Sequence, residues 1–270
     1  YARTLPTPKY WTKAGGAGNA SDGNNWDPTG VPQDGDVIIF SSSGTANCTW
    51  DLTSPLESLS INTGYSGTIT LGNALTVGDF TLTAGGINLN GNNLTVRKSH
   101  IRNGGTFTAG AGTTVEFGGS TAQTISGSAN PIQFGSAHFV VNNSSSVTLQ
   151  QALYFGGNMQ ISAGTLYAGA YEHRILGNWT HTAGSFVSQG STIAFEGTTA
   201  QTVNELNSFS HFKVNSSSSV AITSAPVLGT FTLAQGTVTL NNGDFAIPGS
   251  FVSTSAFSRI EGAGGYRVIY

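Results

Sequence analysis

Three short segments of this chain recur at long, nearly constant intervals, and this repetition limits what the chain can fold into. At intervals of 73 or 78 residues, Ala74–Val77 returns as Ala152–Phe155 and Ala225–Leu228, Thr121–Ile125 as Thr199–Val203, and His138–Val147 as His211–Val220. Repetition on this scale is typical of stacked, quasi-one-dimensional folds in which each unit contacts its neighbours. It favours a structural, adhesive or assembly role over an enzyme built around one site.

Within the repeats, short segments alternate apolar and polar residues and end at Gly or Asn. Residues 77–83 and 114–117 show the period of two that is typical of half-buried strands. Ala-Gly turns at Gly85, Gly164 and Gly184 are predicted to supply the positive φ angles that tight corners need. No long window shows a helical period, so the chain is predicted to be all-β.

Three all-β folds are compatible with this pattern: an array of β-sandwiches, a propeller and a β-solenoid. The strands recur too closely for sandwiches with long crossovers, and the repeat does not divide into propeller blades of roughly 40–50 residues. We therefore predict a parallel β-helix, or β-solenoid, with roughly 25-residue coils. About three such coils would make up each repeat of 73–79 residues.

The chain divides into three predicted parts. Residues 1–13 carry three basic residues and no acid, and form a basic N-terminal arm. Residues 14–58 are aromatic-rich and unlike the repeat, as expected of a capping segment that covers the open core of a solenoid. Residues 59–270 hold nearly three copies of the repeat. Residues 266–270 form a strand pattern with no polar cap after it, and an exposed edge strand is a template for further pairing.

Composition indicates an extracellular β-protein. Only 9% of the residues are charged, far below the roughly 25% of ordinary globular proteins, so Ser, Thr, Asn and Gly must cover the surface. The chain lacks the basic stripe with interleaved aromatics that would indicate nucleic acid binding. It also lacks an apolar run long enough for membrane insertion. The single cysteine, Cys48, excludes an intrachain disulfide and is predicted to be buried.

The segment Asn25–Phe40, followed by Gly- and Asn-rich strand repeats, resembles bacterial secreted or cell-surface β-helix repeat proteins, which are adhesin-like or filament-forming. This resemblance implies a secreted protein of the cell surface, without a catalytic role. A chain that begins at Tyr1 fits the removal of a signal peptide.

Residues capable of chemistry are scattered along the sequence. After residue 79 the acidic residues share no motif, so no pair of carboxylates is predicted for glycoside hydrolysis. His173 and His181 match no zinc spacing and are predicted to be exposed or partly packed. Calcium is the one possible cofactor, with Asp22, Asp27, Asp34 and Asp36 as candidate ligands, although Asp in Gly-rich segments is also a common turn former.

The sequence predicts a secreted, non-enzymatic structural protein that associates head to tail with copies of itself into a surface filament, stalk or sheath. In this hypothesis the last strands of one copy continue the stack into the cap of the next, and the basic arm binds across the junction. The candidate interface residues are Arg3, Lys9, Tyr10, Trp11, Tyr266, Val268 and Tyr270. Two alternatives remain open: an adhesin-like module that binds surface glycans, and a β-helix polysaccharide lyase or hydrolase.

Overall fold

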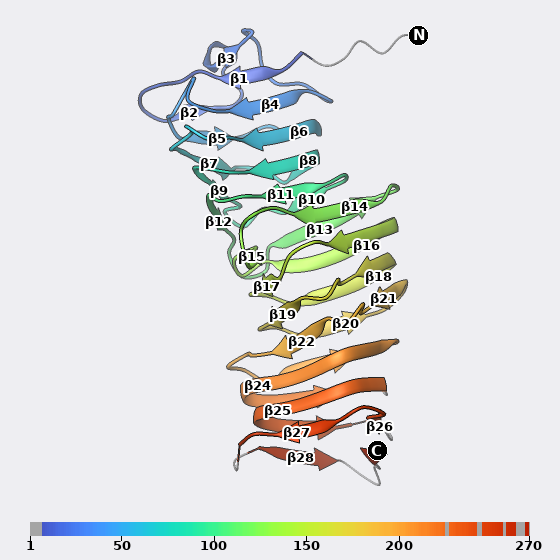
Figure 1. Ribbon diagram of the computed structural model, residues 1–270. Coiled ribbons are helices and arrows are strands. Elements are labelled where there is room, and N and C mark those ends of the chain that lie inside the picture. The colour runs from blue at the N-terminus through green and yellow to red at the C-terminus, as the bar shows by residue number, and fades with distance from the viewer. Residues whose placement is uncertain (1–6, 225–226, 242–244, 256–257, 263–267, 270) are drawn as a thin grey trace.

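The computed structural model describes residues 7–224, 227–241, 245–255, 258–262 and 268–269. These residues form a parallel β-solenoid of about 11 turns, in which 54% of the residues lie in strands, and the predicted fold class is confirmed. Figure 1 shows an elongated column of stacked coils, with the N-terminal strands at one end and the last strands at the other. The only helical segment in the described ranges is a single 3₁₀ turn, η1 (Gly23–Asn25).

Most strands are short, and the longest are β16, β24 and β25 in the second half of the chain. The first group is β1 Lys9–Trp11, β2 Gly18–Asn19, β3 Trp26–Asp27, β4 Val37–Phe40, β5 Cys48–Trp50, β6 Leu56–Ile61, β7 Thr68–Leu71, β8 Leu75–Leu82, β9 Gly86–Asn88, β10 Leu94–Val96, β11 His100–Arg102 and β12 Thr106–Thr108. The second group is β13 Thr114–Gly119, β14 Gln123–Ser126, β15 Ile132–Gln133, β16 His138–Leu149, β17 Leu153–Phe155, β18 Met159–Tyr167, β19 Glu172–Ile175, β20 Trp179–His181, β21 Ser185–Val187, β22 Thr192–Phe195 and β23 Gln201–Asn204. The last group is β24 Ser208–Ile222, β25 Val227–Leu240, β26 Phe245–Ala246, β27 Phe251–Ser253, β28 Arg259–Gly262 and β29 Val268–Ile269.

Each coil has three sides, and the strands of each side stack in parallel from coil to coil. Side 1 contains β10, β13, β20, β23 and β28. Side 2 contains β4, β11, β14, β21, β26 and β29. Side 3 contains β5, β7, β9 and β12, and after an interruption β15, β17, β19, β22 and β27. Long strands such as β16, β18, β24 and β25 bend around corners and so join the sides into one large sheet.

Most coils are shorter than predicted. Leu75 pairs with Leu94 and Phe139 with Met159, which gives coils of 19 and 20 residues. Only coils with extra residues at a corner approach the predicted length, such as the 24 residues between the paired Trp179 and Val203.

The sequence repeat therefore does not equal three coils. Equivalent residues of its three copies lie on different sides: Val77 on side 1, Phe155 on side 3 and Leu228 on side 2. Each copy spans three coils and two further sides, so it is turned by one side relative to the copy before it.

The residues inserted at two corners belong to the repeated Thr-Ala-Gln-Thr segments, whose glutamines fold inward. Gln123 and Gln201 are buried, and their amides bond to main-chain groups around the corner. Gln123 Nε2 donates to Val96 O at 2.8 Å. Gln201 Nε2 donates to Ile175 O at 3.1 Å and to Gly177 O at 2.7 Å, and Gly197 N donates to Gln201 Oε1 at 2.9 Å. The glutamine of the repeated motif thus stabilises the corner, because it bonds to buried main-chain groups that would be destabilising without a partner.

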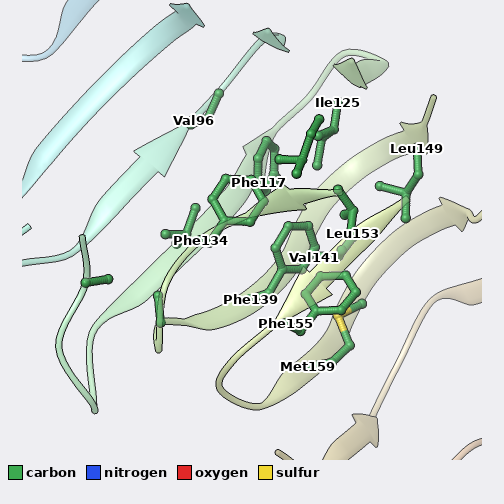
Figure 2. Close-up of a cluster of buried hydrophobic side chains, with 14 of the residues drawn as sticks. Val96, Phe117, Ile125, Phe134, Phe139, Val141, Leu149, Leu153, Phe155 and Met159 are labelled. Carbon is green, nitrogen blue, oxygen red and sulfur yellow. The ribbon is translucent and has the colours of Figure 1, made fainter. Parts of the chain in front are cut away.

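The interior is a single core of stacked apolar side chains. Figure 2 shows Phe117, Phe139 and Phe155 lying next to one another inside the column. The ring centroids of Phe117 and Phe139 are 5.0 Å apart, and those of Phe139 and Phe155 are 4.8 Å apart. Because these rings are fully desolvated, truncation of one to Ala is expected to cost about 3–5 kcal/mol. The core is therefore the main source of stability.

Glycine corners support this stack, as predicted. Gly85, Gly164 and Gly184 have φ angles of 57°, 71° and 86°, in the left-handed region that side chains with a Cβ avoid. At Gly184 a Cβ would also collide with the main chain of the coil before it, around Ala163 and Gly164. The two constraints together explain why Gly recurs at this corner.

Candidate functional site

The N-terminal end of the column is closed by an aromatic lid, formed by β1, β3 and the residues around them. Trp11, Trp26, Phe40 and Trp50 are buried and pack mainly edge to face, with the centroids of Trp11 and Trp26 5.2 Å apart. The indole nitrogens of Trp11 and Trp26 donate to main-chain carbonyl oxygens at 3.1 and 2.9 Å. Large aromatic rings thus cover the end of the core with two of the three indole nitrogens bonded, and the buried Trp50 Nε1 has no hydrogen-bond partner among the described residues.

The lid also covers the strand edges at this end. On side 2, β1 pairs in parallel with β4 and in antiparallel fashion with β3, so the outermost strand is only two residues long. On side 3, the outward carbonyl oxygen of Asn19 in β2 accepts bonds from Asn25 Nδ2 at 3.0 Å and from Asp22 N at 3.3 Å. Short edge strands and covered edges are ways in which proteins prevent further strand pairing. The N-terminal end is thus built as a terminus of the stack.

The last coil differs from the lid. Strands β27, β28 and β29 each pair with a strand of the coil before them, and no described strand pairs with their far edges. Val252 in β27 is 43% exposed, and Phe251 and Ile260 are only partly covered, although they pack against the core. Among the described residues, the C-terminal coil therefore leaves a parallel edge and apolar surface that the N-terminal end does not.

The predicted interface residues have different environments. Lys9 is held in the lid, where its Nζ donates to Pro28 O at 3.2 Å and to Gly30 O at 3.1 Å. Tyr10 is 38% exposed, but Trp11 is fully buried, so Trp11 is a core residue of the lid and not a surface contact. Val268 lies in β29, where its main chain pairs with Phe245. Arg3, Tyr266 and Tyr270 lie outside the described residues.

The predicted domain boundaries need two corrections. Residues 9–11 form β1 inside the lid and do not extend from it as an arm. The parallel ladder already includes β4 and β5, so stacking starts before residue 59, the predicted first residue of the solenoid.

Of the aspartates proposed for calcium, Asp22, Asp34 and Asp36 lie in or beside turns, and Asp27 ends β3. Asp22 Oδ1 accepts from Asn24 N at 3.0 Å, and Asp36 Oδ2 accepts from Gln33 N at 2.9 Å. Asp27 and Asp34 are exposed. No three His, Cys, Asp or Glu side chains come together in a way that could hold a metal ion within the described ranges.

Two histidines are buried where exposure or partial packing was predicted. His173 and His181 are 1% and 0% exposed, because each takes an inward position of its strand. His181 Nδ1 lies 2.7 Å from Glu205 Oε1, and Glu205 also accepts from Trp179 Nε1 at 2.6 Å and from Asn207 N at 2.7 Å. This group fills a corner of the core and has no access to solvent, so it is a structural polar cluster.

Among the described residues of the C-terminal half, side 3 carries most of the charged side chains. Glu172, Arg174, Glu196 and Lys213 all lie on β19, β22 or β24 or directly after them, whereas the outward residues of the other sides are mainly Thr, Ser, Asn and Val. Arg174 forms an ion pair with Glu196, and its guanidinium carbon lies 5.6 Å from the centroid of the Tyr154 ring. Lys213 Nζ lies 3.4 Å from Glu172 Oε2 and reaches it across β22.

A hollow of about 400 Å³ lies beside the Lys213–Glu172 pair. Its lining comes from Glu172, Thr192, His211, Lys213, Thr230 and Thr232, with Phe212 beneath them. Glu172, Thr192, His211 and Thr230 are partners in one row across four strands. The proximity of these residues could not be predicted from the sequence, because it depends on the coil length.

The fold defines the class of this protein as a parallel β-solenoid. No family model, curated protein or solved structure matches the chain. Across the part of the chain that the structure describes, no helix is long and apolar enough to cross a membrane.

Proposed function

We propose that this protein is a non-enzymatic structural rod of the cell surface, secreted by its source cell, that joins end to end with a second copy through its last coil. The observation that carries the proposal is the contrast between the two ends. The lid covers its strand edges, whereas among the described residues β27, β28 and β29 pair on one side only. Unpaired parallel edges next to partly covered apolar side chains favour association through added strands.

The lid supports contact between two last coils over head-to-tail contact. Head-to-tail stacking would require the last coil to pair with the lid, but β3 offers only two residues there and the Asn19 carbonyl is already bound. Contact between two last coils uses the edges of β27, β28 and β29 and needs no free edge at the lid. Their strands would meet in antiparallel fashion about a twofold axis, and such an isologous contact closes after two copies. The product is a rod of double length with a lid at each outer end.

The test uses an edge residue whose N–H is not needed within the chain. Phe231 N donates to Ser250 O, and Thr254 N donates to Leu233 O, so by alternation the N–H of Ser253 points away from β25. Ser253→Pro removes that outward donor without removing a bond to β25, as tolerated on edge strands. Ser253→Thr keeps the donor and is the matched control.

Sedimentation equilibrium across the micromolar range should show dimers for the wild type and for Ser253→Thr, and monomers for Ser253→Pro. Electron microscopy should show rods of two lengths that correspond to these states. A wild-type chain that stays monomeric at every concentration overturns the proposal, and so does a Ser253→Pro chain that dimerises like the wild type. Open filaments of many copies would overturn the tail-to-tail arrangement in favour of head-to-tail stacking.

A further inference from the structure

The hollow on side 3 is a concavity of the described surface that acidic, basic and hydroxyl groups line together. Its volume of about 400 Å³ lies within the range of ligand sites in proteins, roughly 300–1,000 Å³. The residues that line it stand on β19, β22, β24 and β25, which are rigid strands of one parallel ladder. Its shape is therefore fixed before any ligand arrives.

The Lys213–Glu172 pair is open to a ligand. Lys213 Nζ is 3.4 Å from both carboxylate oxygens of Glu172, longer than the roughly 2.7–2.9 Å of a charge-assisted hydrogen bond. Both side chains are partly exposed. The neighbouring Arg174 is different, because its charge is already bound by Glu196 and its guanidinium lies over Tyr154. Lys213 and Glu172 thus retain donor and acceptor capacity at the edge of the hollow.

His211 adds a third polar group. Its side chain is exposed, and no hydrogen bond joins its ring to any of the described residues. It stands between Thr192 and Thr230 in the same row. Neighbouring strands lie about 4.8 Å apart, so the row offers polar groups at regular steps along the column axis.

These groups select a ligand by its charge. A free anion would meet the Glu172 carboxylate, and a free cation would meet the Lys213 ammonium. A hydroxyl group suits both, because it can donate to a carboxylate and accept from an ammonium at the same time. A chain that carries hydroxyl groups at regular steps would also bond to the threonine and histidine side chains of the row.

We infer that the hollow formed by Glu172, Thr192, His211, Lys213 and Thr230 binds a neutral oligosaccharide that lies along the column axis. The site is independent of the proposed end-to-end contact, because its residues precede the last coil. An assembly-defective variant should therefore bind the sugar as the wild type does.

The test is calorimetric titration of the purified chain with cellohexaose, maltohexaose and chitohexaose as neutral probes, and with hexagalacturonate as the acidic probe. Two variants remove groups of the site: Lys213→Ala removes the ammonium, and Thr230→Val removes a hydroxyl with little change of shape. Lys98→Ala is the matched control, because it breaks the exposed Lys98–Glu57 ion pair elsewhere on the column. Circular dichroism of each variant verifies that it is folded.

We expect at least one neutral hexasaccharide to bind, with affinity about tenfold lower for Lys213→Ala, since bonds to charged groups are the strong ones. Thr230→Val should also weaken binding, and Lys98→Ala should change the affinity by less than about twofold. The inference is overturned if no neutral probe binds, if hexagalacturonate binds more tightly than all of them, or if Lys98→Ala weakens binding as much as Lys213→Ala.

Discussion

Two buried histidines, His100 and His173, predict that the solenoid loses stability in mild acid. Burial, with the nearby charge of Arg102 as a smaller cause, lowers the pKa of His100 from 6.5 to about 3. Burial lowers the pKa of His173 from 6.5 to about 4. His173 Nδ1 accepts a hydrogen bond from Leu153 N at 3.2 Å, and its Nε2 bonds to Ala168 O at 2.8 Å. A second proton would have to bind Nδ1, where it would face the N–H of Leu153.

The sign and size of the effect follow from proton linkage. Both folded-state pKa values lie below the unfolded value, so the unfolded chain takes up protons first as the pH falls. The contribution is complete above the unfolded pKa of 6.5, decreases below it, and stops decreasing only when the pH passes the folded values of about 4 and 3. At about pH 5 each histidine costs about 2 kcal/mol of the free energy of unfolding, and this figure hardly depends on the folded pKa if that value is near 4 or lower.

The variant His100→Phe tests this reasoning. The imidazole stands among Phe80, Phe117 and Phe134, with ring centroids 5.0, 6.2 and 5.3 Å away, so a phenyl ring fits the chemistry of the site and cannot titrate. Urea denaturation at about pH 7.5 and about pH 5 should show that the wild type loses about 2 kcal/mol more than the variant. Fluorescence and circular dichroism must report the same transition, because repeat proteins can unfold in stages. If both chains lose the same free energy, the buried neutral histidine is not the cause.

Two further variants test the polar groups of the core by urea denaturation at neutral pH. Gln201→Ala removes the side-chain partner of Gly177 O and of Gly197 N, whereas Ile175 O keeps its bond from Glu196 N. It should lower the free energy of unfolding by about 3 kcal/mol, whereas Thr202→Ala on the exposed face should lower it by less than about 1 kcal/mol. Equal losses would contradict the corner role. Glu205→Gln replaces one acceptor oxygen by an NH₂ group that faces a donor, either Trp179 Nε1 or Asn207 N, and should cost about 2 kcal/mol. An unchanged stability would show that the second acceptor is not needed.

The fold could be predicted because its causes are local in the sequence. Alternation in segments such as residues 77–83 specifies which side chains face the core, and Gly85, Gly164 and Gly184 specify corners. The coil length could not be predicted in the same way. The prediction divided the repeat into three equal coils, but a sequence repeat need not contain a whole number of coils. Here the repeat contains three coils and two sides of a fourth coil.

The candidate sites could be predicted less well, because they depend on register between distant residues. Glu172 and Lys213 are 41 residues apart and meet only because two successive coils have nearly equal length. Trp11 and His173 were placed near the surface because a tryptophan near a chain end and a histidine among polar residues carry no local sign of burial. The inward position of each follows from the strand register, which alternation over three residues does not define.

The rotation of the repeat explains why a repetitive chain can carry a single hollow of this kind. His138 and His211 occupy equivalent positions in the repeat, but His138 lies on side 1 and His211 on side 3. Around His138 the position of Lys213 is taken by Val140, and His138 Nδ1 already accepts a bond from Asn158 N at 3.0 Å. Because successive copies face different sides, a side displays each motif once, and neighbouring motifs on that side come from different parts of the repeat. The hollow therefore depends on residues that the copies do not share. The titration with oligosaccharides should accordingly saturate at one ligand per chain.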